Sequence, residues 1–166
     1  GTITQNAGII STTTSGGITL TSEGASTLRA VTSAGALSLA KKTTSATYGV
    51  NGYTLTVPGL LTIGSGVTLD MGGADSSIVN TGGTFTNNGI LQLEGDEVLT
   101  NLTNDSASGT VTYDGAGAYA TGLKAGNSYY NLTFNGVGSW TLNAALDVNG
   151  NLTITAGTLN ANGKAI

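Results

Sequence analysis

Short runs of alternating apolar and polar residues dominate the chain from residue 53 onward. The first three cover residues 53–57, 61–63 and 67–71, and each is followed within two residues by a glycine. Strict alternation over three to five residues predicts a short β-strand with one buried face. The same pattern predicts further strands at residues 90–93, 110–113, 131–134, 140–142, 146–148 and 151–154.

Regular spacing links these runs. Leu132, Leu142 and Leu152 recur at intervals of ten, so the tripeptide at residues 131–133 returns at residues 151–153. Strands of three to five residues are too short to form a stable hairpin sheet alone, but they suit coils that stack on one another. We therefore predict an all-β protein, a parallel β-helix (β-solenoid) of about seven short coils of roughly 20–24 residues each.

The predicted strands assign a side to each apolar residue. Successive side chains of a strand point to opposite faces, so the apolar set should line the core while its threonine neighbours face water. The residues expected to point inward are Leu55, Val57, Leu61, Ile63, Val67 and Leu69.

Asn-Gly pairs provide the evidence for a rival fold. They begin at Asn51, Asn88, Asn135, Asn149 and Asn162. In antiparallel proteins such pairs form type I′ hairpin turns, which would give a β-sandwich with tight hairpins. In a solenoid the same residues occupy corners that need positive φ. The shortness of the strands and the frequency of the turns favour the solenoid.

The alternation is uneven along the chain, which suggests two regions. Residues 1–46 are less regular and are interpreted as an edge or strand-donating segment, with strands expected at 2–4, 18–21 and 37–39. Residues 47–166 are interpreted as the solenoid repeats. Within them, the tyrosine-rich span 114–130 lacks alternation and is predicted to be an excursion from the coil.

Composition removes several kinds of chemistry. There is no His and no Cys, which excludes disulfides, thiolate nucleophiles, Cys/His zinc sites and histidine bases. Only five residues are Lys or Arg, too few for a phosphate-binding stripe, so nucleic acid is not an expected partner. No apolar run approaches the ~20 residues of a membrane-spanning helix, so membrane insertion is not expected. Glycine-rich chains can be disordered, but the 39% of hydrophobic residues stand in ordered alternation here.

Two segments carry a family resemblance. Residues 66–73 (GVTLDMGG) and 151–159 (NLTITAGTL) resemble the strand repeats of large bacterial exported proteins. These are the passenger regions of autotransporters and filamentous-haemagglutinin-type adhesins. The resemblance covers residues 53–166 and is compositional. It implies a right-handed β-helix on a cell surface, with an adhesive or scaffolding role.

Carboxylates form the first group of candidate site residues. Glu94, Asp96 and Glu97 cluster around a glycine and are a weak candidate for a Ca²⁺ site, although a solvated turn is the simpler interpretation. Asp70 and Asp75 flank a Gly-Gly turn, and paired carboxylates can cleave polysaccharides. Neither has a basic partner near it in sequence. We therefore expect no catalytic residues, no cofactor and no enzymatic activity.

Tyrosine and threonine side chains that are expected at the surface suggest two further kinds of binding site. Tyr119, Tyr129 and Tyr130 are predicted to make contacts from the excursion, either with surface glycans or with a protein. Outward threonines could align into a flat array of the kind that binds ice. Threonine is also simply a good strand former, and outward Asn, Asp and Gln interrupt the array.

The two ends of the predicted solenoid indicate which partners the chain should have. A stacked solenoid exposes strand edges at its ends, and the sequence shows no capping element at either end. Copies of the chain are therefore expected to associate head to tail or by strand donation. The sequence predicts a secreted or cell-surface structural protein, either an adhesin segment or a self-assembling filament subunit. The alternative is a carbohydrate-binding or carbohydrate-cleaving β-helix protein.

Overall fold

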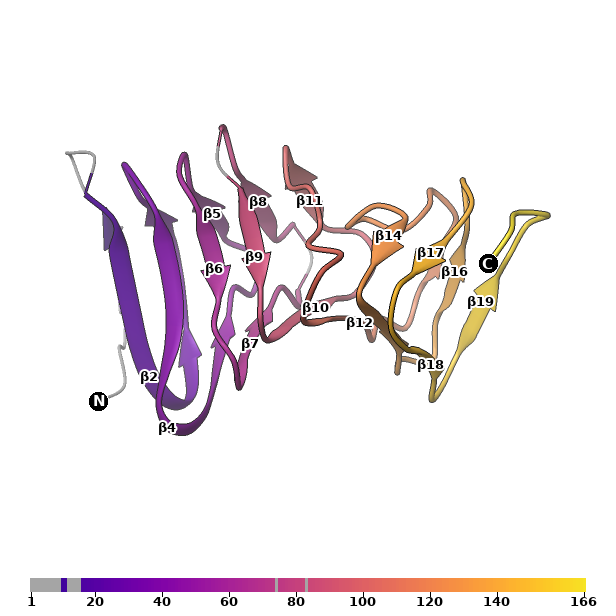
Figure 1. Ribbon diagram of the computed structural model, residues 1–166, viewed down its shortest axis with the longest axis horizontal. Coiled ribbons are helices and arrows are strands. Elements are labelled where there is room, and N and C mark those ends of the chain that lie inside the picture. The colour runs from indigo at the N-terminus through magenta and orange to yellow at the C-terminus, as the bar shows by residue number, and fades with distance from the viewer. Residues whose placement is uncertain (1–9, 12–15, 74, 83) are drawn as a thin grey trace.

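The computed structural model describes residues 10–11, 16–73, 75–82 and 84–166. These residues form nineteen β-strands and no helix. The strands stack side by side along the long axis of the molecule (Figure 1). Their bounds are β1 Ile10–Ser11, β2 Ile18–Thr27, β3 Val31–Thr32, β4 Leu37–Gly49, β5 Thr54–Thr56, β6 Leu61–Ile63, β7 Val67–Asp70, β8 Ser77–Val79, β9 Phe85–Asn87, β10 Ile90–Leu93, β11 Val98–Thr100, β12 Thr110–Tyr113, β13 Ala118–Tyr119, β14 Ser128–Tyr129, β15 Asn131–Phe134, β16 Ser139–Thr141, β17 Asp147–Val148, β18 Leu152–Ile154 and β19 Thr158–Asn160.

Each coil contributes a strand to three walls in turn. We call wall 1 the sheet β1-β3-β5-β8-β11 together with β13-β16-β19. Wall 2 contains the first halves of β2 and β4 with β6 and β9, and then β14 and β17. Wall 3 contains the second halves of β2 and β4 with β7, β10, β12, β15 and β18. Leu55, Leu61 and Val67, six residues apart, therefore lie on three successive walls of one coil.

Every strand pairing among the described residues is parallel, which confirms the predicted β-solenoid of about seven turns. The hairpin β-sandwich is excluded, since it requires antiparallel pairs. Wall 3 shows the repeat most clearly: Leu69 pairs with Leu91, Leu91 with Val111, and Val111 with Leu132. Leu132 in turn pairs with Leu152, so the recurring Asn-Leu-Thr tripeptide marks one full coil.

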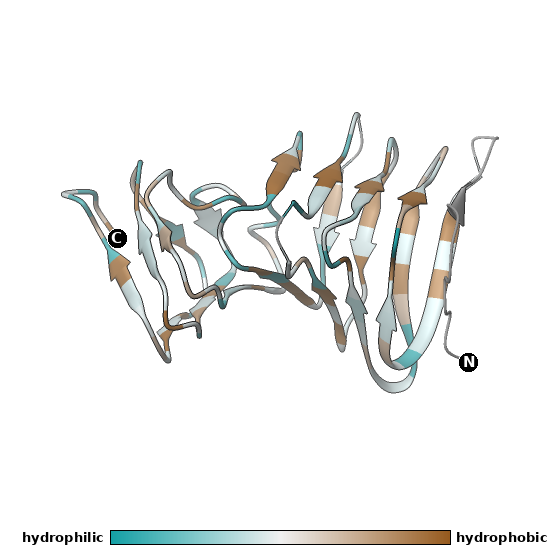
Figure 2. Ribbon diagram, turned by 180° about the vertical axis from the view of Figure 1, so that it is seen from behind, coloured by the Kyte–Doolittle hydropathy of each residue, from teal (hydrophilic) through white to brown (hydrophobic). Residues whose placement is uncertain are grey.

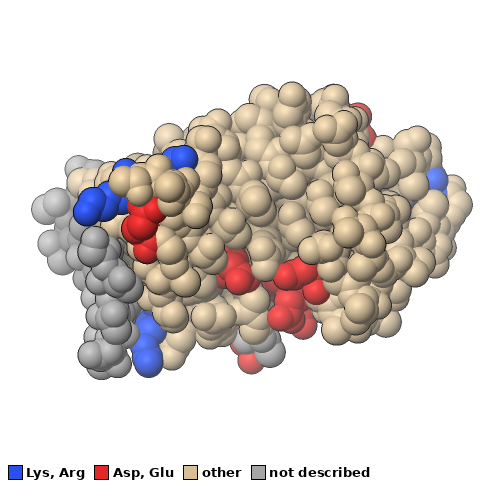
Figure 3. Space-filling model, turned by 90° about the horizontal axis from the view of Figure 1, so that it is seen from below, with Lys and Arg blue, Asp and Glu red and all other residues tan. Residues whose placement is uncertain are grey.

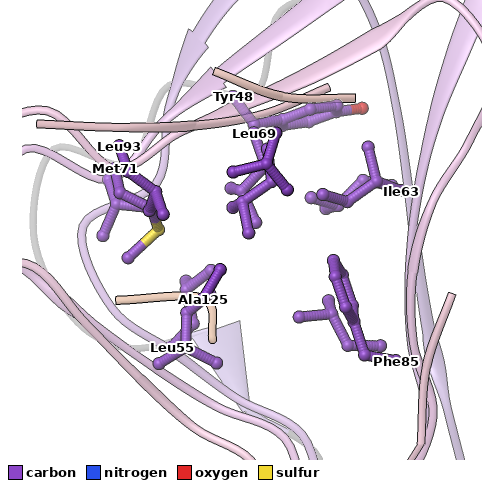
Figure 4. Close-up of a cluster of buried hydrophobic side chains, with 14 of the residues drawn as sticks. Tyr48, Leu55, Ile63, Leu69, Met71, Phe85, Leu93 and Ala125 are labelled. Carbon is purple, nitrogen blue, oxygen red and sulfur yellow. The ribbon is translucent and has the colours of Figure 1, made fainter. Parts of the chain in front are cut away.

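The core is a continuous apolar column inside the three walls. All six residues predicted to point inward are buried, at 0–1% exposure. Apolar and polar positions alternate along the strands (Figure 2). In the interior, Tyr48, Ile63, Leu69 and Phe85 come from three successive coils and lie in one cluster (Figure 4). The Tyr48 hydroxyl donates to the carbonyl oxygens of Leu20 (2.9 Å) and Ala40 (2.7 Å), which satisfies its only polar atom.

The N-terminal region differs from the expectation. The predicted strand at residues 2–4 lies outside the described residues. Strands at 18–21 and 37–39 are present, but they belong to β2 and β4, the two longest strands, which pair with each other over nine positions. The expected boundary at residue 46 falls inside β4. The sequence hid this regularity because β4 bends through an exposed polar stretch, where Glu23 accepts hydrogen bonds from the N–H groups of Thr43 and Thr44.

The predicted excursion at residues 114–130 is also corrected. This span contains β13, which pairs with β16, and β14, which pairs with β17. It is therefore one coil of the solenoid. Its strands are only two residues long, so no alternation marked them in the sequence.

Candidate functional site

The most unusual feature of the stack is an interruption between the coils of β10 and β14. Wall 3 runs through it without a break, because β10 pairs with β12 and β12 with β15. Wall 1 stops at β11 and restarts at β13, and wall 2 stops at β9 and restarts at β14. Residues 101–109 occupy the place of a wall-2 strand without forming one. We call residues 102–107 the wall-2 loop.

Side chains of this region bond to the neighbouring strands in place of a ladder. The Asp105 carboxylate accepts the N–H of Asn87 in β9 (3.0 Å), and the Ser108 hydroxyl donates to the Asn87 carbonyl oxygen (2.9 Å). On the other side, Asn104 Nδ2 donates to the carbonyl oxygen of Ser128 in β14 (2.9 Å). Burial raises the pKa of Asp105, but the hydrogen bonds from Ala107, Asn87 and Ser108 together outweigh it and lower that pKa.

Two clefts flank the wall-2 loop. The larger, of about 340 Å³, lies between the loop and β9, and its lining is Thr84, Phe85, Thr103, Asn104, Asp105, Ser106 and Ala107. The smaller, of about 190 Å³, lies between the loop and β14, and its lining is Leu102, Thr103, Asn104, Ala125, Gly126, Asn127 and Ser128. In the smaller cleft, the buried Oδ1 atoms of Asn104 and Asn127 have no hydrogen-bond partner among the described residues.

The wall-1 break is closed by aromatic side chains. Trp140 in β16 and Tyr119 in β13 stack with ring centroids 5.7 Å apart, and both lie against Gly95. Trp140 Nε1 donates to the carbonyl oxygen of Glu94 (2.9 Å). Phe134 packs against the same indole at 5.1 Å. The two halves of wall 1 are thus joined by side-chain packing instead of strand pairing.

The weak Ca²⁺ candidate is not supported. Glu97 is 2% exposed and turns inward, where its carboxylate accepts the N–H groups of Glu94 and Gly95. Asp96 is exposed instead. Across the described residues, no group of three or more acidic side chains is arranged to hold a metal ion. Burial raises the pKa of Glu97, which disfavours the charged form that a cation would need.

Of the two aspartates considered for polysaccharide cleavage, Asp70 ends β7 and Asp75 lies in the turn that follows. Asp70 Oδ1 accepts the N–H of Gly72 (2.9 Å), and Asp75 has a φ of 69° in an exposed turn. The structure brings a different carboxylate close to Asp70. Burial, and then the charges of Asp70 and Glu94, raise the pKa of Asp114, whose Oδ2 accepts a hydrogen bond from Gln92.

The three candidate tyrosines have different environments. Tyr129 is fully buried, and its hydroxyl donates to the carbonyl oxygen of Gly126 (2.6 Å), so the prediction of a surface contact is wrong for this residue. Tyr119 is half-buried under Trp140. Tyr130 is 39% exposed and remains available for contact. The correction has a simple cause: Tyr129 lies on β14, where alternation sends it inward and its neighbour outward.

Outward threonines do not form a continuous array on wall 3. Thr47 pairs with Thr68, but the next position in this row is Ile90. In a second row, Thr112, Thr133 and Thr153 follow one another only after Asp70 and Gln92. The flat hydroxyl surface needed for ice binding is therefore interrupted on this wall.

The fold and this geometry define a class, the β-solenoid repeat proteins, in which one coil is interrupted on two of three walls. Comparison of the chain with known protein families, curated proteins and solved structures finds no match. No helix in the described part of the chain is long and apolar enough to cross a membrane.

Proposed function

We propose that this chain is a rigid structural segment of an extracellular surface protein, a stalk or adhesin module that acts by stacking β-coils. The observation that carries the proposal is wall 3, which continues without interruption from β2 to β18. Behind it runs one apolar cluster, from Leu20 to Leu146. A continuous sheet over a continuous core resists bending and supports a spacer role.

The outer surface supports an extracellular location. Much of the face in Figure 3 carries neither acidic nor basic side chains. Charged residues make up only 8% of the chain. Thr, Ser and Asn occupy many of the outward strand positions, beside Asp70, Gln92 and Ile90. Such a surface limits charge-driven binding and leaves hydroxyl and amide groups for contact with water or sugars.

We propose no catalytic activity. The buried Glu97 bonds to main-chain N–H groups, and Asp70 bonds to the N–H of Gly72. Both carboxylates thus stabilise turns. Tyr130 is the most exposed of the three candidate contact tyrosines. Its surface can make contacts with a partner, which is a binding role and not a catalytic one.

Spin labels can test rigidity directly, because the chain contains no cysteine. Exposed residues Thr27 and Asn160 lie near opposite ends of the described stack and can be replaced by cysteine and labelled. Pulsed electron–electron double resonance should give one narrow distribution of distances between the two labels. A control pair within one coil, at exposed Thr54 and Ser65, sets the width due to the labels alone. A distribution for the long pair that is much broader than the control would refute the rigid-spacer role.

Self-assembly into filaments is a second candidate, favoured by one observation. Ile154 occupies an inward position, in register with the buried Phe134, yet it is 51% exposed. Within the described residues, no coil covers it or the outer edges of β18 and β19. A further coil, from continuing polypeptide or from a second copy, would bury this surface. Sedimentation velocity over a concentration series should show association that Ile154→Lys abolishes. A monomer at every concentration would remove the filament role and leave the spacer role standing.

A further inference from the structure

Wall 1 carries two rows of short side chains on its outer face, over the strands β3, β5, β8 and β11 (Figure 1). The inward residues of the first three strands are Val31, Leu55 and Ile78, each 0% exposed. Because successive side chains point to opposite faces, the residues beside them face outward. We call this outward set the wall-1 array: Thr54, Ser77 and Val98 in one row, and Thr32, Thr56, Val79 and Thr100 in the other.

Strand pairing keeps both rows in register from coil to coil. In the row that begins at Thr32, each residue pairs with the next one along the stack. In the other row, the hydroxyl oxygens of Thr54 and Ser77 lie 2.7 Å apart and share a hydrogen bond. Paired strands are spaced by about 4.7–4.9 Å, so the side chains of each row repeat at this interval along the solenoid.

The side chains of the array are stiff and uncharged. Six of the seven are Thr or Val, whose branched Cβ restricts rotation about χ1. Their methyl and hydroxyl groups are therefore held in place before any ligand arrives, which reduces the entropy lost on binding. The outer face of wall 3 differs, because Asp70, Gln92 and Ile90 interrupt its threonine rows.

The composition of the array disfavours the usual ligands of proteins. It contains no aromatic ring and no arginine, the side chains that anchor most protein interfaces. It contains no ionisable group to pair with a charged partner. Neither of the two clefts beside the wall-2 loop is lined by the array, so it does not enclose a small molecule. These features favour a ligand that is itself an extended, neutral surface of repeating hydrogen-bonding groups.

We propose that the wall-1 array is an ice-binding surface. Each water molecule in ice is bonded tetrahedrally to four others at about 2.8 Å, which places second-neighbour oxygens about 4.6 Å apart. This distance is close to the spacing of the paired strands, about 4.7–4.9 Å. The hydroxyl groups of successive coils can therefore bond to one row of lattice water, while the methyl groups lie between the bonded positions. The site adds a ligand to the structural role and does not depend on it.

A second copy of the chain, packed face to face, is the competing occupant of wall 1. Stacked sheets interdigitate their side chains across a layer about 10 Å thick, which large apolar residues fill. The side chains of the array are short, and five of the seven carry a hydroxyl group. Face-to-face packing would remove these hydroxyls from water without supplying partners for them, which is costly. Ice supplies a partner for each.

The test measures thermal hysteresis and the uptake of protein into a slowly growing ice crystal. The unaltered protein should separate the melting and freezing temperatures and should enter the ice. Thr56→Lys should reduce the hysteresis about tenfold, because a charged side chain at the centre of the array would lose its water on binding. Thr100→Lys, at the exposed end of the same row, should act in the same direction but less strongly.

Thr62→Lys is the matched control. Thr62 is half-buried like Thr56 and belongs to the same coil, but it lies on wall 2, where its outward neighbours are Leu60 and Gly64. This variant should bind ice like the unaltered protein. Circular dichroism should give all three variants the melting temperature of the unaltered protein within a few degrees, since each change is on the outer face.

Three results would overturn the proposal. The first is that the unaltered protein shows no hysteresis and stays in the liquid. The second is that Thr62→Lys loses as much activity as Thr56→Lys. The third is that sedimentation velocity detects a dimer that Thr56→Lys dissociates, while ice takes up no protein, which would assign wall 1 to a second copy of the chain.

Discussion

The indole N–H of Trp140 donates to the carbonyl oxygen of Glu94 at 2.9 Å, across 46 residues of sequence. This hydrogen bond joins β16, which lies in wall 1 after the interruption, to the turn that precedes β11. Tyr119 stacks on the same indole and covers Gly95, where any Cβ would lie 2.7 Å from the tyrosine ring. Where strand pairing fails, an aromatic staple takes its place.

Trp140 should therefore be central to stability. Trp140→Phe keeps an aromatic ring but removes the hydrogen bond to Glu94, and it should lower the free energy of unfolding by about 1 kcal/mol. Trp140→Ala also empties a fully buried site and should cost about 3–5 kcal/mol. Urea denaturation followed by circular dichroism measures both. Equal losses for the two variants would show that the ring contributes nothing beyond the hydrogen bond.

Gly136 tests the close approach of neighbouring coils. A Cβ at this position would lie 2.2 Å from the main-chain carbon of Asp114 in the preceding coil. Gly136→Ala should therefore push two coils apart and lower the free energy of unfolding by about 3 kcal/mol. Gly82→Ala is the matched control, since its nearest neighbour would be 3.8 Å away. Denaturant midpoints compare the two, and a tolerated Gly136→Ala would contradict the close packing.

Glu97 should make the stability depend on pH. Burial raises its pKa in the folded chain above the ordinary 4.5. A raised carboxyl pKa means that folding favours the protonated form. Its contribution is therefore fully present below pH 4.5 and is lost as pH rises through the folded pKa. Glu97→Gln should abolish this decline in melting temperature, whereas Asp96→Asn, at an exposed neighbour, should retain it. A decline that persists in Glu97→Gln would assign it to another group.

Asp105 should show the opposite dependence. Hydrogen bonds from Ala107, Asn87 and Ser108 outweigh burial and lower its pKa below the ordinary 3.8. Its stabilisation is present above pH 3.8 and is lost as pH falls through the lower folded pKa. Asp105→Ala should lower the free energy of unfolding by about 2 kcal/mol at pH 7. It should also reduce the loss of stability that the unaltered protein shows as the pH falls. Hydrogen exchange at the Asn87 amide should accelerate in the same variant, and an unchanged rate would show that Asp105 does not cap β9.

The stacking register could be predicted from sequence, because it depends on local alternation and spacing. Leu132 and Leu152 do pair. The six apolar residues predicted to point inward, from Leu55 to Leu69, are all buried. Turn chemistry was only partly readable: the Asn-Gly pairs at Asn51 and Asn162 have positive φ, whereas those at Asn88, Asn135 and Asn149 do not. Prediction failed for Tyr129 and Glu97, since two-residue strands and turns carry too little periodicity to show which side chains point inward.

By itself, the sequence determined the wall pattern of this protein. Alternating Thr and Leu dictate short strands with one buried face, and recurring glycines and asparagines dictate corners. Only the tertiary structure decided where the walls stop. The interruption at residues 101–109, the staple between Trp140 and Glu94, and the unpaired Oδ1 atoms of Asn104 and Asn127 arise from contacts between coils. These contacts join residues 18 or more apart in sequence, beyond the reach of any local pattern.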